Sequence, residues 1–292
     1  NQSYFFYNMK IRIGGVPEHF NLPIHLAIEN GDFLKKGIEV EWITFKGGTG
    51  QMTRALREDE VDVCILLTEG IITDIIKGNP SKIISQYVTT PLVWGVHTAA
   101  NNKLQQHSDI YTKKYAISRF GSGSHLMAIV DANTQKEALD ASQFEVIKNL
   151  DGALESLSNL ETDVFYWEKF TTKPYIDNGQ LKRVGEFITP WPCFVIAATN
   201  KIIASQPDAI TQMLEVIHQS CRAFMQNDEA VQLVSQRYHQ KLEDVAHWYH
   251  STEWATHGWV SNKMIKNVLF NIKTANIIEK DEVIPELIWR RN

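Results

Sequence analysis

A glycine- and serine-rich stretch, SRFGSGSHLM at residues 118–127, contains residue types that can hold an anion. It follows a short apolar segment, Tyr115–Ile117, and its last residues open an apolar helix. Backbone N–H groups at a helix start lack partners within the helix, and the helix dipole makes that end positive. The two glycines allow close approach of a ligand, and the two serines supply hydroxyls or a helix cap. The candidate ligand-binding residues in this stretch are Arg119, Gly121, Ser122, Gly123, Ser124 and His125.

A second glycine-rich helix start precedes it in the chain. FKGGTGQM, residues 45–52, follows the strand-like VEWITF and opens the helix-like QMTRALRE. Either motif alone is compatible with an ordinary capped strand–turn–helix, with no ligand. Two such motifs predict the two halves of one cleft. The candidates from this copy are Gly47, Gly48 and Thr49.

The composition restricts the class of protein. A chain of 292 residues exceeds a typical single core and favours two lobes. Hydrophobic residues make up 43% and charged residues 22%, which is typical of a soluble globular protein. The net charge of −5 and the lack of a basic stripe argue against nucleic-acid binding. No apolar run approaches the roughly 20 residues that a membrane-spanning helix needs, so we expect no membrane insertion.

The cysteines and histidines predict neither a metal site nor a cofactor. Cys64, Cys193 and Cys221 are far apart with no CxxC pair, which indicates neither a zinc site nor a disulfide framework. The first two lie in apolar strand-like segments and are expected to be buried, inert thiols. The segment 247–259 is rich in Trp and His and could cap a lobe or form a dimer contact. Its histidines lack the spacing for one helix face, so we assign it no metal.

The N-terminus bears on the compartment. Residues 1–8 have no basic region, long apolar run or cleavage-like pattern, and Met9 already begins a strand-like segment. We therefore expect residues 1–8 to be a non-native extension ahead of a natural start at Met9, and the protein to be cytoplasmic. The alternative is a periplasmic protein whose signal peptide has been removed.

The order of the segments predicts an α/β protein. From Met9 to Thr90, strand-like and helix-like segments alternate with short loops, which favours a parallel sheet. A second α/β unit is expected within 115–168, and everything from Pro207 on is expected to be helical. Pro91 on one side, and Pro190 and Pro192 on the other, bracket the middle unit. We expect a first lobe of 9–92 and 192–292, and an inserted second lobe of 93–191, joined by two crossover strands and closing by hinge motion.

This order of segments resembles that of the type II periplasmic binding proteins. The matching elements are ENGDFLKKGIEVEWITFKGGTG, ALREDEVDVCIL, YAISRFGSGSH and DGALESLSNLETDVFYWEKF. They are similar to the branch that binds alkanesulfonates, taurine, nitrate and thiamine pyrimidines. The resemblance implies a two-lobed α/β fold with two crossover strands, C-terminal helices and a ligand cleft between the lobes.

The resemblance also implies ligand-site positions, all just after strand ends, where open α/β sheets bind ligands. Beyond the two glycine-rich stretches they are Glu18, His19, Thr68, Glu69, Gly70, Trp167 and Glu168, with Pro91, Trp94 and Trp191 near the crossovers. Each has a structural alternative, because a histidine can cap a helix and a tryptophan buries large area anywhere. Glu168 follows the apolar run VFYW, where a carboxylate needs a partner, and is therefore the strongest acidic candidate.

The mixture of side chains indicates the kind of ligand. A simple oxyanion does not need three carboxylates nearby, whereas an aromatic heterocycle with N–H donors can stack on tryptophan and donate to carboxylates. We therefore expect a small heterocycle similar to a thiamine pyrimidine. A zwitterion whose anionic end lies at the GSGS turn is also allowed.

Three classes of function remain open from the sequence. The first is a non-catalytic binding protein, with a transporter partner if it lies outside the cytoplasm and a sulfonate or another small anion as an alternative ligand. The second is an enzyme of cofactor synthesis, since a fungal thiamine-pyrimidine synthase shares this fold. That synthase carries a cysteine cluster absent here, and only Lys46 stands where a lysine–histidine pair is expected, so we assign no catalytic residues. The third is an interaction protein whose cleft has lost its ligand.

Overall fold

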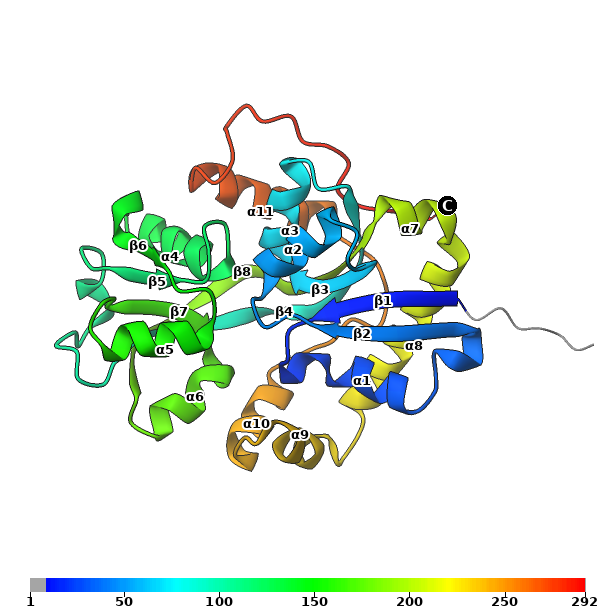
Figure 1. The fold of residues 1–292 in the computed structure, drawn as a ribbon, viewed down its shortest axis with the longest axis horizontal. Coiled ribbons are helices and arrows are strands. Elements are labelled where there is room, and N and C mark those ends of the chain that lie inside the picture. The colour runs from blue at the N-terminus through cyan, green and yellow to red at the C-terminus, as the bar shows by residue number, and fades with distance from the viewer. Residues whose placement is uncertain (1–8, 292) are drawn as a thin grey trace, which may run out of the picture.

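The computed structural model describes residues 9–291, which form two α/β units joined by two long strands (Figure 1). A single eight-stranded sheet runs through both units in the order β2-β1-β3-β8-β4-β7-β5-β6. The strands are β1 (Met9–Gly15), β2 (Ile38–Thr44), β3 (Val63–Leu67), β4 (Ser81–Ala99), β5 (Tyr115–Ile117), β6 (Phe144–Val146), β7 (Val164–Glu168) and β8 (Leu181–Thr199). The non-native extension predicted for residues 1–8 lies outside the described residues.

Helices cover the sheet, and further helices follow β8. They are α1 (Leu22–Glu29), α2 (Thr49–Arg57), α3 (Thr68–Ile76), α4 (Gly123–Thr134), α5 (Leu150–Ser158), α6 (Lys169–Asp177), α7 (Asn200–Ser205), α8 (Pro207–Met225), α9 (Ala230–Tyr238), α10 (Leu242–His250) and α11 (Asn262–Thr274). Within the described range, no helix combines the length and the apolar character that crossing a membrane requires.

The first unit follows the predicted alternation closely. β1 and β2 pair in parallel from Met9 opposite Ile38 to Gly15 opposite Thr44. β3 is buried along its whole length because strands pair with it on both sides and helices cover it, as its apolar run VCILL predicts.

The parallel pairing expected from Met9 to Thr90 is found for β1, β2 and β3, but the two long strands run antiparallel to their neighbours. β8 is antiparallel to β3, and β4 is antiparallel to both β8 and β7. Apolar periodicity reports which residues are buried but not the direction of a strand, so the sequence pattern could not show this.

The prolines lie within the two long strands and do not end them. Pro91 lies opposite Pro192 within one continuous β4–β8 ladder, with register shifts on both sides of Pro91. Proline lacks an N–H donor, and a bulge absorbs the missing bond without terminating the strand. β4 and β8 are therefore single strands of 19 residues each that continue through these prolines. The lobe boundaries at 92/93 and 191/192 stay a prediction.

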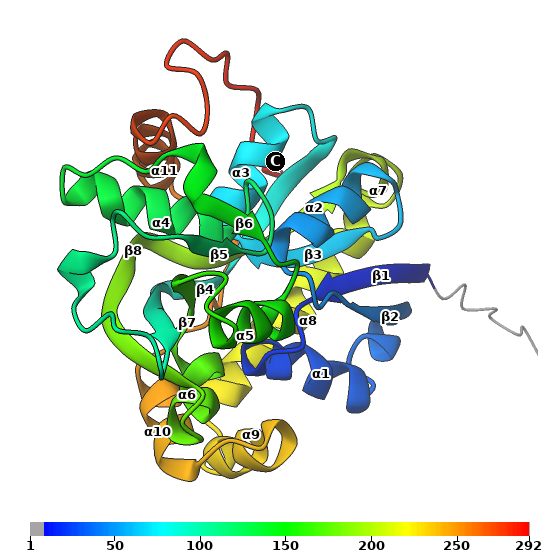
Figure 2. The same cartoon turned by 60° about the vertical axis from the view of Figure 1, so that its left-hand side comes forward.

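The second unit contains β5, β6 and β7 in parallel, with α4, α5 and α6 between and after them. α6 starts directly after β7 and lies beside α10 in both views (Figure 1, Figure 2). Two ion pairs join these neighbours: Lys173 Nζ lies 3.4 Å from Asp244 Oδ2, and Lys241 Nζ lies 2.9 Å from Asp177 Oδ2. The C-terminal helices therefore contact the second unit as well as the first.

The expectation that the chain is helical throughout after Pro207 is wrong. Residues 251–261 and 275–291 are largely irregular and return to β4, where Trp254 bridges Val88 and Ile288 bridges Ile83. Trp248 and Trp254, from the Trp- and His-rich segment 247–259, are both buried, with ring centroids 5.3 Å apart. Large aromatic rings make this irregular segment part of the core.

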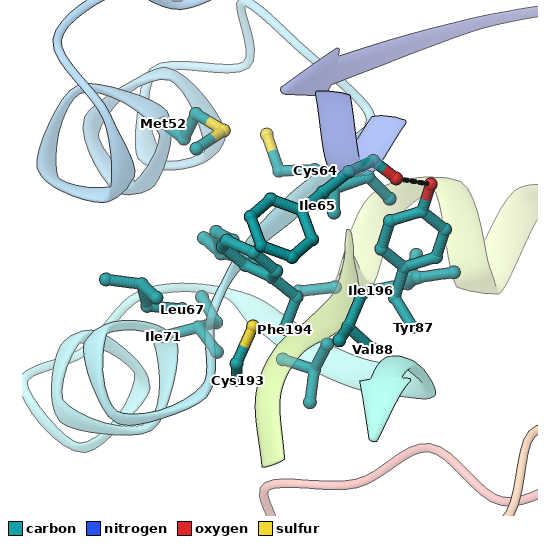
Figure 3. Packing of buried hydrophobic residues seen from close by; sticks show 14 of the residues in the cluster. Met52, Cys64, Ile65, Leu67, Ile71, Tyr87, Val88, Cys193, Phe194 and Ile196 are labelled. Carbon is teal, nitrogen blue, oxygen red and sulfur yellow. Dashed lines mark hydrogen bonds between the residues drawn. The ribbon is translucent and has the colours of Figure 1, made fainter. Parts of the chain in front are cut away.

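The core beneath the cleft is a cluster of aromatic and aliphatic side chains from β3, β4 and β8 (Figure 3). Phe194 packs against Phe20 with centroids 5.2 Å apart. Tyr87 is buried and donates a 2.7 Å hydrogen bond to the Phe20 carbonyl, to which Trp254 Nε1 also donates at 3.0 Å. These two bonds tie the loop after β1 to β4 and to the C-terminal segment.

Replacing Tyr87 with phenylalanine should lower the free energy of unfolding by about 1 kcal/mol, the usual net value of one hydrogen bond. The loss stays small because Trp254 still bonds the Phe20 carbonyl. Urea denaturation checks it, with Tyr175→Phe as the control, since the Tyr175 hydroxyl makes no hydrogen bond within residues 9–291. Equal losses in the two variants would contradict the role of this bond.

Candidate functional site

A cavity of about 520 Å³ lies between the two units, where β1, β3 and β7 end and α2 and α4 begin. This is the cleft that the two glycine-rich helix starts predict. Nine of the predicted residues line it: Glu18, Gly48, Thr49, Trp94, Ser122, Gly123, Ser124, Trp167 and Glu168.

Two carboxylates face this cavity from opposite units. Glu168 ends β7 and caps α6, where its oxygens accept hydrogen bonds from the N–H of Phe170 at 2.7 Å and of Thr171 at 2.9 Å. Glu18 follows β1, and its carboxylate forms no hydrogen bond or ion pair with any residue between 9 and 291. One acid is thus fixed by a helix start, and the other is free to meet a ligand.

Burial disfavours the charged form of both acids. It raises the pKa of Glu18 to about 8, and the nearby charge of Glu168 adds to the rise. Burial also raises the pKa of Glu168, although its hydrogen bonds from Phe170 and Thr171 oppose the rise. A cation or a strong N–H donor in the cavity would stabilise the charged form of Glu18, and the Glu18 carboxylate would in turn attract that ligand.

Aromatic and aliphatic side chains form the walls. Trp94 is buried and donates a 2.8 Å hydrogen bond from Nε1 to Thr189 Oγ1, which fixes its ring. Trp167 is half-buried and stacks on Phe165, with centroids 5.1 Å apart and planes 21° apart. These walls suit a flat ligand that stacks on an indole ring.

The start of α4 offers N–H groups rather than hydroxyls. Ser122 Oγ accepts from the His125 N–H at 3.3 Å, and Ser124 Oγ lies 3.0 Å from Ser122 Oγ and accepts from the Ser118 N–H at 3.0 Å. These hydroxyls are therefore engaged inside their own loop. The backbone N–H groups of Gly123 and Ser124 have no partner among residues 9–291. They are the free donors that a helix start presents to a ligand.

Four of the predicted residues lie deep in the protein and do not line the cavity. His19 packs edge-on against Trp248, with centroids 4.1 Å apart, and burial lowers its pKa to about 3. Thr68 Oγ1 donates to the Pro192 carbonyl at 2.6 Å, and Trp191 Nε1 donates to Glu69 Oε2 at 2.7 Å. Burial raises the pKa of Glu69 to about 7. Position after a strand end locates a residue near the cleft but does not decide which way its side chain points.

The remaining predicted residues lie at the rim. The Gly47 N–H donates to Gln51 Oε1 at 2.8 Å, and the Gly121 N–H donates to His125 Nδ1 at 3.0 Å. Burial lowers the pKa of His125 to about 4. Arg119 and Gly121 border a separate cavity.

Six lining residues were not among the predicted ones: Val16, Met52, Leu67, Leu92, Ser118 and Phe194. Five of them are apolar, and apolar residues look the same in sequence whether they face a cavity or a packed core. Two of the six carried a signal, since Ser118 belongs to the first glycine-rich stretch and Met52 to the second.

Known proteins share this architecture. A family model described as Ca3427-like PBP matches residues 94–187. The CA3427 gene product of Candida albicans, reported to define a new family with the generic periplasmic binding protein fold, is 26% identical with a TM-score of 0.88. The alignment covers 97% of this chain and 99% of that one. No curated protein matches the chain.

More distant structures share the fold alone. The alkanesulfonate-binding protein SsuA from Xanthomonas axonopodis pv. citri, bound to MOPS, is 12% identical with a TM-score of 0.80, over 97% of this chain and 98% of that one. The nitrate-binding protein NrtA from Synechocystis PCC 6803 is 13% identical with a TM-score of 0.69, over 94% of this chain and 83% of that one. The predicted periplasmic-binding-protein fold is confirmed, and this fold supports a general role in ligand binding.

The raised pKa of Glu18 predicts that stability falls as pH rises. Between its usual value of 4.5 and about 8, the native state keeps a proton that the unfolded chain has lost. The native state then binds more protons, so the free energy of unfolding decreases with pH across this window. We expect Glu18→Gln to remove about 1–3 kcal/mol of this decrease between pH 5 and pH 8, since one pKa unit corresponds to about 1.4 kcal/mol and residual solvent exposure weakens the effect.

Urea denaturation at pH 5, 6, 7 and 8 measures this, with Glu155→Gln on the exposed face of α5 as the matched control. The control should keep the wild-type pH dependence. A Glu18→Gln variant that also keeps it would show that Glu18 titrates normally in the native state.

Proposed function

We propose that this protein binds a small heterocycle with N–H donors, similar to a thiamine pyrimidine, and closes over it without catalysis. The observation that carries the proposal is the pair of acids, half-buried Glu18 and buried Glu168, facing a cavity lined by Trp94 and Trp167. Glu18 has an unengaged carboxylate, so a protonated ring nitrogen or an amino group would give it a charge-assisted hydrogen bond.

The apolar walls support a flat ligand. Trp94 is held in place by its bond to Thr189, and Phe194 and Leu92 complete an aromatic and aliphatic lining. An aminopyrimidine ring can stack on an indole while its edge donates to carboxylates. Such a ligand uses both kinds of side chain in the cavity, whereas a simple oxyanion uses neither acid.

The thiols support binding over catalysis. Burial raises the pKa of Cys64, Cys193 and Cys221 above the usual range of a thiol. A nucleophilic cysteine needs a lowered pKa, so these thiols lack thiolate character.

A second candidate is an aliphatic sulfonate or a zwitterion, in the manner of an importer's binding component with a membrane transporter as its partner. The specific observation in its favour is the pair of free N–H groups of Gly123 and Ser124 at the start of α4. In this case the anionic group lies at α4, and Glu18 and Glu168 require a positive group at the other end of the ligand.

Titration calorimetry with an aminopyrimidine of thiamine synthesis, taurine and an alkanesulfonate tests the two candidates on protein refolded to remove carried-over ligand. We expect heat with the aminopyrimidine, and a 10- to 100-fold weaker affinity in Glu18→Gln, about the value of one hydrogen bond to a charged group. Glu155→Gln should bind as the wild type does. Binding of the sulfonate alone, with Glu18→Gln unaffected, would overturn the heterocycle proposal.

Gly123 offers a second test, because a side chain there meets the opposite wall. A Cβ atom at Gly123 would lie 2.5 Å from Leu67 Cδ1 and 2.8 Å from Trp94 Cη2. Gly123→Val should therefore abolish ligand binding by filling the cavity. The variant should remain folded without denaturant, which urea denaturation checks.

Gly258→Ala is the control for Gly123→Val, since its Cβ would meet no atom closer than 3.6 Å. A Gly123→Val protein that is folded and still binds would place the ligand elsewhere. A protein that binds none of the compounds in the wild-type form would favour an interaction protein.

A further inference from the structure

A second cavity, of about 490 Å³, lies at the rim of the cleft and is separate from the acidic one. α2 and α3 of the first unit form one side of it, and the loop 119–121 before α4 forms the other. Thr49 borders both cavities, so they adjoin each other.

The charges around this second cavity are opposite to those of the first. Arg57, Lys77 and Arg119 line it against a single acid, Asp74. Asp74 is already engaged, since its carboxylate lies 2.5 Å from Arg57 Nη1 and accepts a 2.6 Å bond from Asn79. An excess of positive charge is thus gathered here, on a chain whose net charge is −5.

Arg119 holds the least compensated of these charges. It is half-buried, and its guanidinium forms no hydrogen bond or ion pair with the residues at 9–291. Burial lowers its pKa, and the charges of Arg54 and Arg57 lower it further. A half-buried guanidinium with like charges nearby and no acid is stabilised by any anion that enters the cavity.

Neutral donors point to the same ligand class. Thr73 is 6% exposed and lines the cavity, and its hydroxyl has no hydrogen-bond partner in the described part of the chain. The N–H groups of Gly50 and Gln51, at the start of α2, are likewise without a partner there. A buried hydroxyl without a partner costs free energy unless a ligand or water bonds it.

The cavity takes its lining from both units. The stem of Arg119 lies against α2, because a Cβ atom at Gly50 would be 2.3 Å from Arg119 Cδ. An anion held between Arg119 and the start of α2 would therefore join the two units, and its binding would favour the closed arrangement.

We propose that this rim cavity is a binding site for an oxyanion of the phosphate class, contacted by Arg119, Lys77, the Thr73 hydroxyl and the N–H groups at the start of α2. A tetrahedral oxyanion matches an arginine fork and several N–H or O–H donors at once. The oxyanion is either free in solution or the phosphate group of a ligand whose other end occupies the acidic cavity. The site does not depend on which compound the acidic cavity binds.

Titration calorimetry with inorganic phosphate, against chloride at equal ionic strength, tests the site in the full chain. We expect saturable phosphate binding that weakens at least about 10-fold in Arg119→Gln and about 3- to 10-fold in Thr73→Val, which keeps the shape of the side chain. Lys263→Gln is the matched control, because it removes a positive charge from the exposed face of α11 and should leave the affinity unchanged.

The two sources of the oxyanion are separated by a second titration. A compound that binds the acidic cavity is compared with its phosphate monoester. If the ester binds at least about 10-fold more tightly, and Arg119→Gln removes that gain, the site holds the phosphate group of the ligand. If inorganic phosphate binds with the same affinity in the presence and in the absence of the unphosphorylated compound, the site holds a free anion.

Two results would overturn the proposal. The first is a wild-type protein that shows no heat with phosphate beyond that with chloride and no gain from a phosphate ester. The second is phosphate binding that Lys263→Gln weakens as much as Arg119→Gln does, which would indicate only a general attraction to positive charge. A failure of heterocycle binding in the acidic cavity would leave both readouts with inorganic phosphate intact.

Discussion

The antiparallel pairing of β4 and β8 is the interaction on which the rest of this structure depends. Each strand is 19 residues long and pairs with the other through nearly its whole length, from Ser81 opposite Thr199 to Ala99 opposite Leu181. At one end of the ladder β8 pairs with β3, and at the other end β4 pairs with β7. The ladder therefore carries two α/β units on one sheet and sets the space between them. Pro91 and Pro192 lie opposite each other near the middle of the ladder, where neither supplies an N–H donor.

The two cavities follow from this arrangement. Both units present strand ends and helix starts toward the same gap, so acids that follow strands and N–H groups that begin helices are brought together. Glu18 follows β1, Glu168 follows β7, and Gly123 begins α4. Positive charge gathers instead around Arg119, where the loop before α4 reaches α2. One gap thus contains an acidic, aromatic pocket and a basic rim pocket side by side.

α6 connects the candidate site with the C-terminal helices. Its first turn is held by Glu168, whose carboxylate faces the acidic cavity, and its last turn reaches Lys241 through Asp177. One helix therefore contacts both the acidic cavity, at its start, and the C-terminal helices, at its end. The Trp-rich segment strengthens the same side, because Trp248 and Trp254 pack around Phe20 close to Glu18 in the chain.

The sequence by itself determined the α/β class, the two glycine-rich helix starts and the place of Glu168 at the end of an apolar strand, because each depends on local patterns of apolar residues, glycine and caps. It also indicated most of the polar residues of the cleft through their positions after strand ends. Only the tertiary structure decided that β4 and β8 are continuous and antiparallel, since periodicity does not specify direction. Only the tertiary structure turned Glu18 toward the cavity while it packed the adjacent His19 against Trp248. The side-chain directions, the apolar walls and the placing of Arg119 beside α2 depend on contacts between distant segments, which no local pattern encodes.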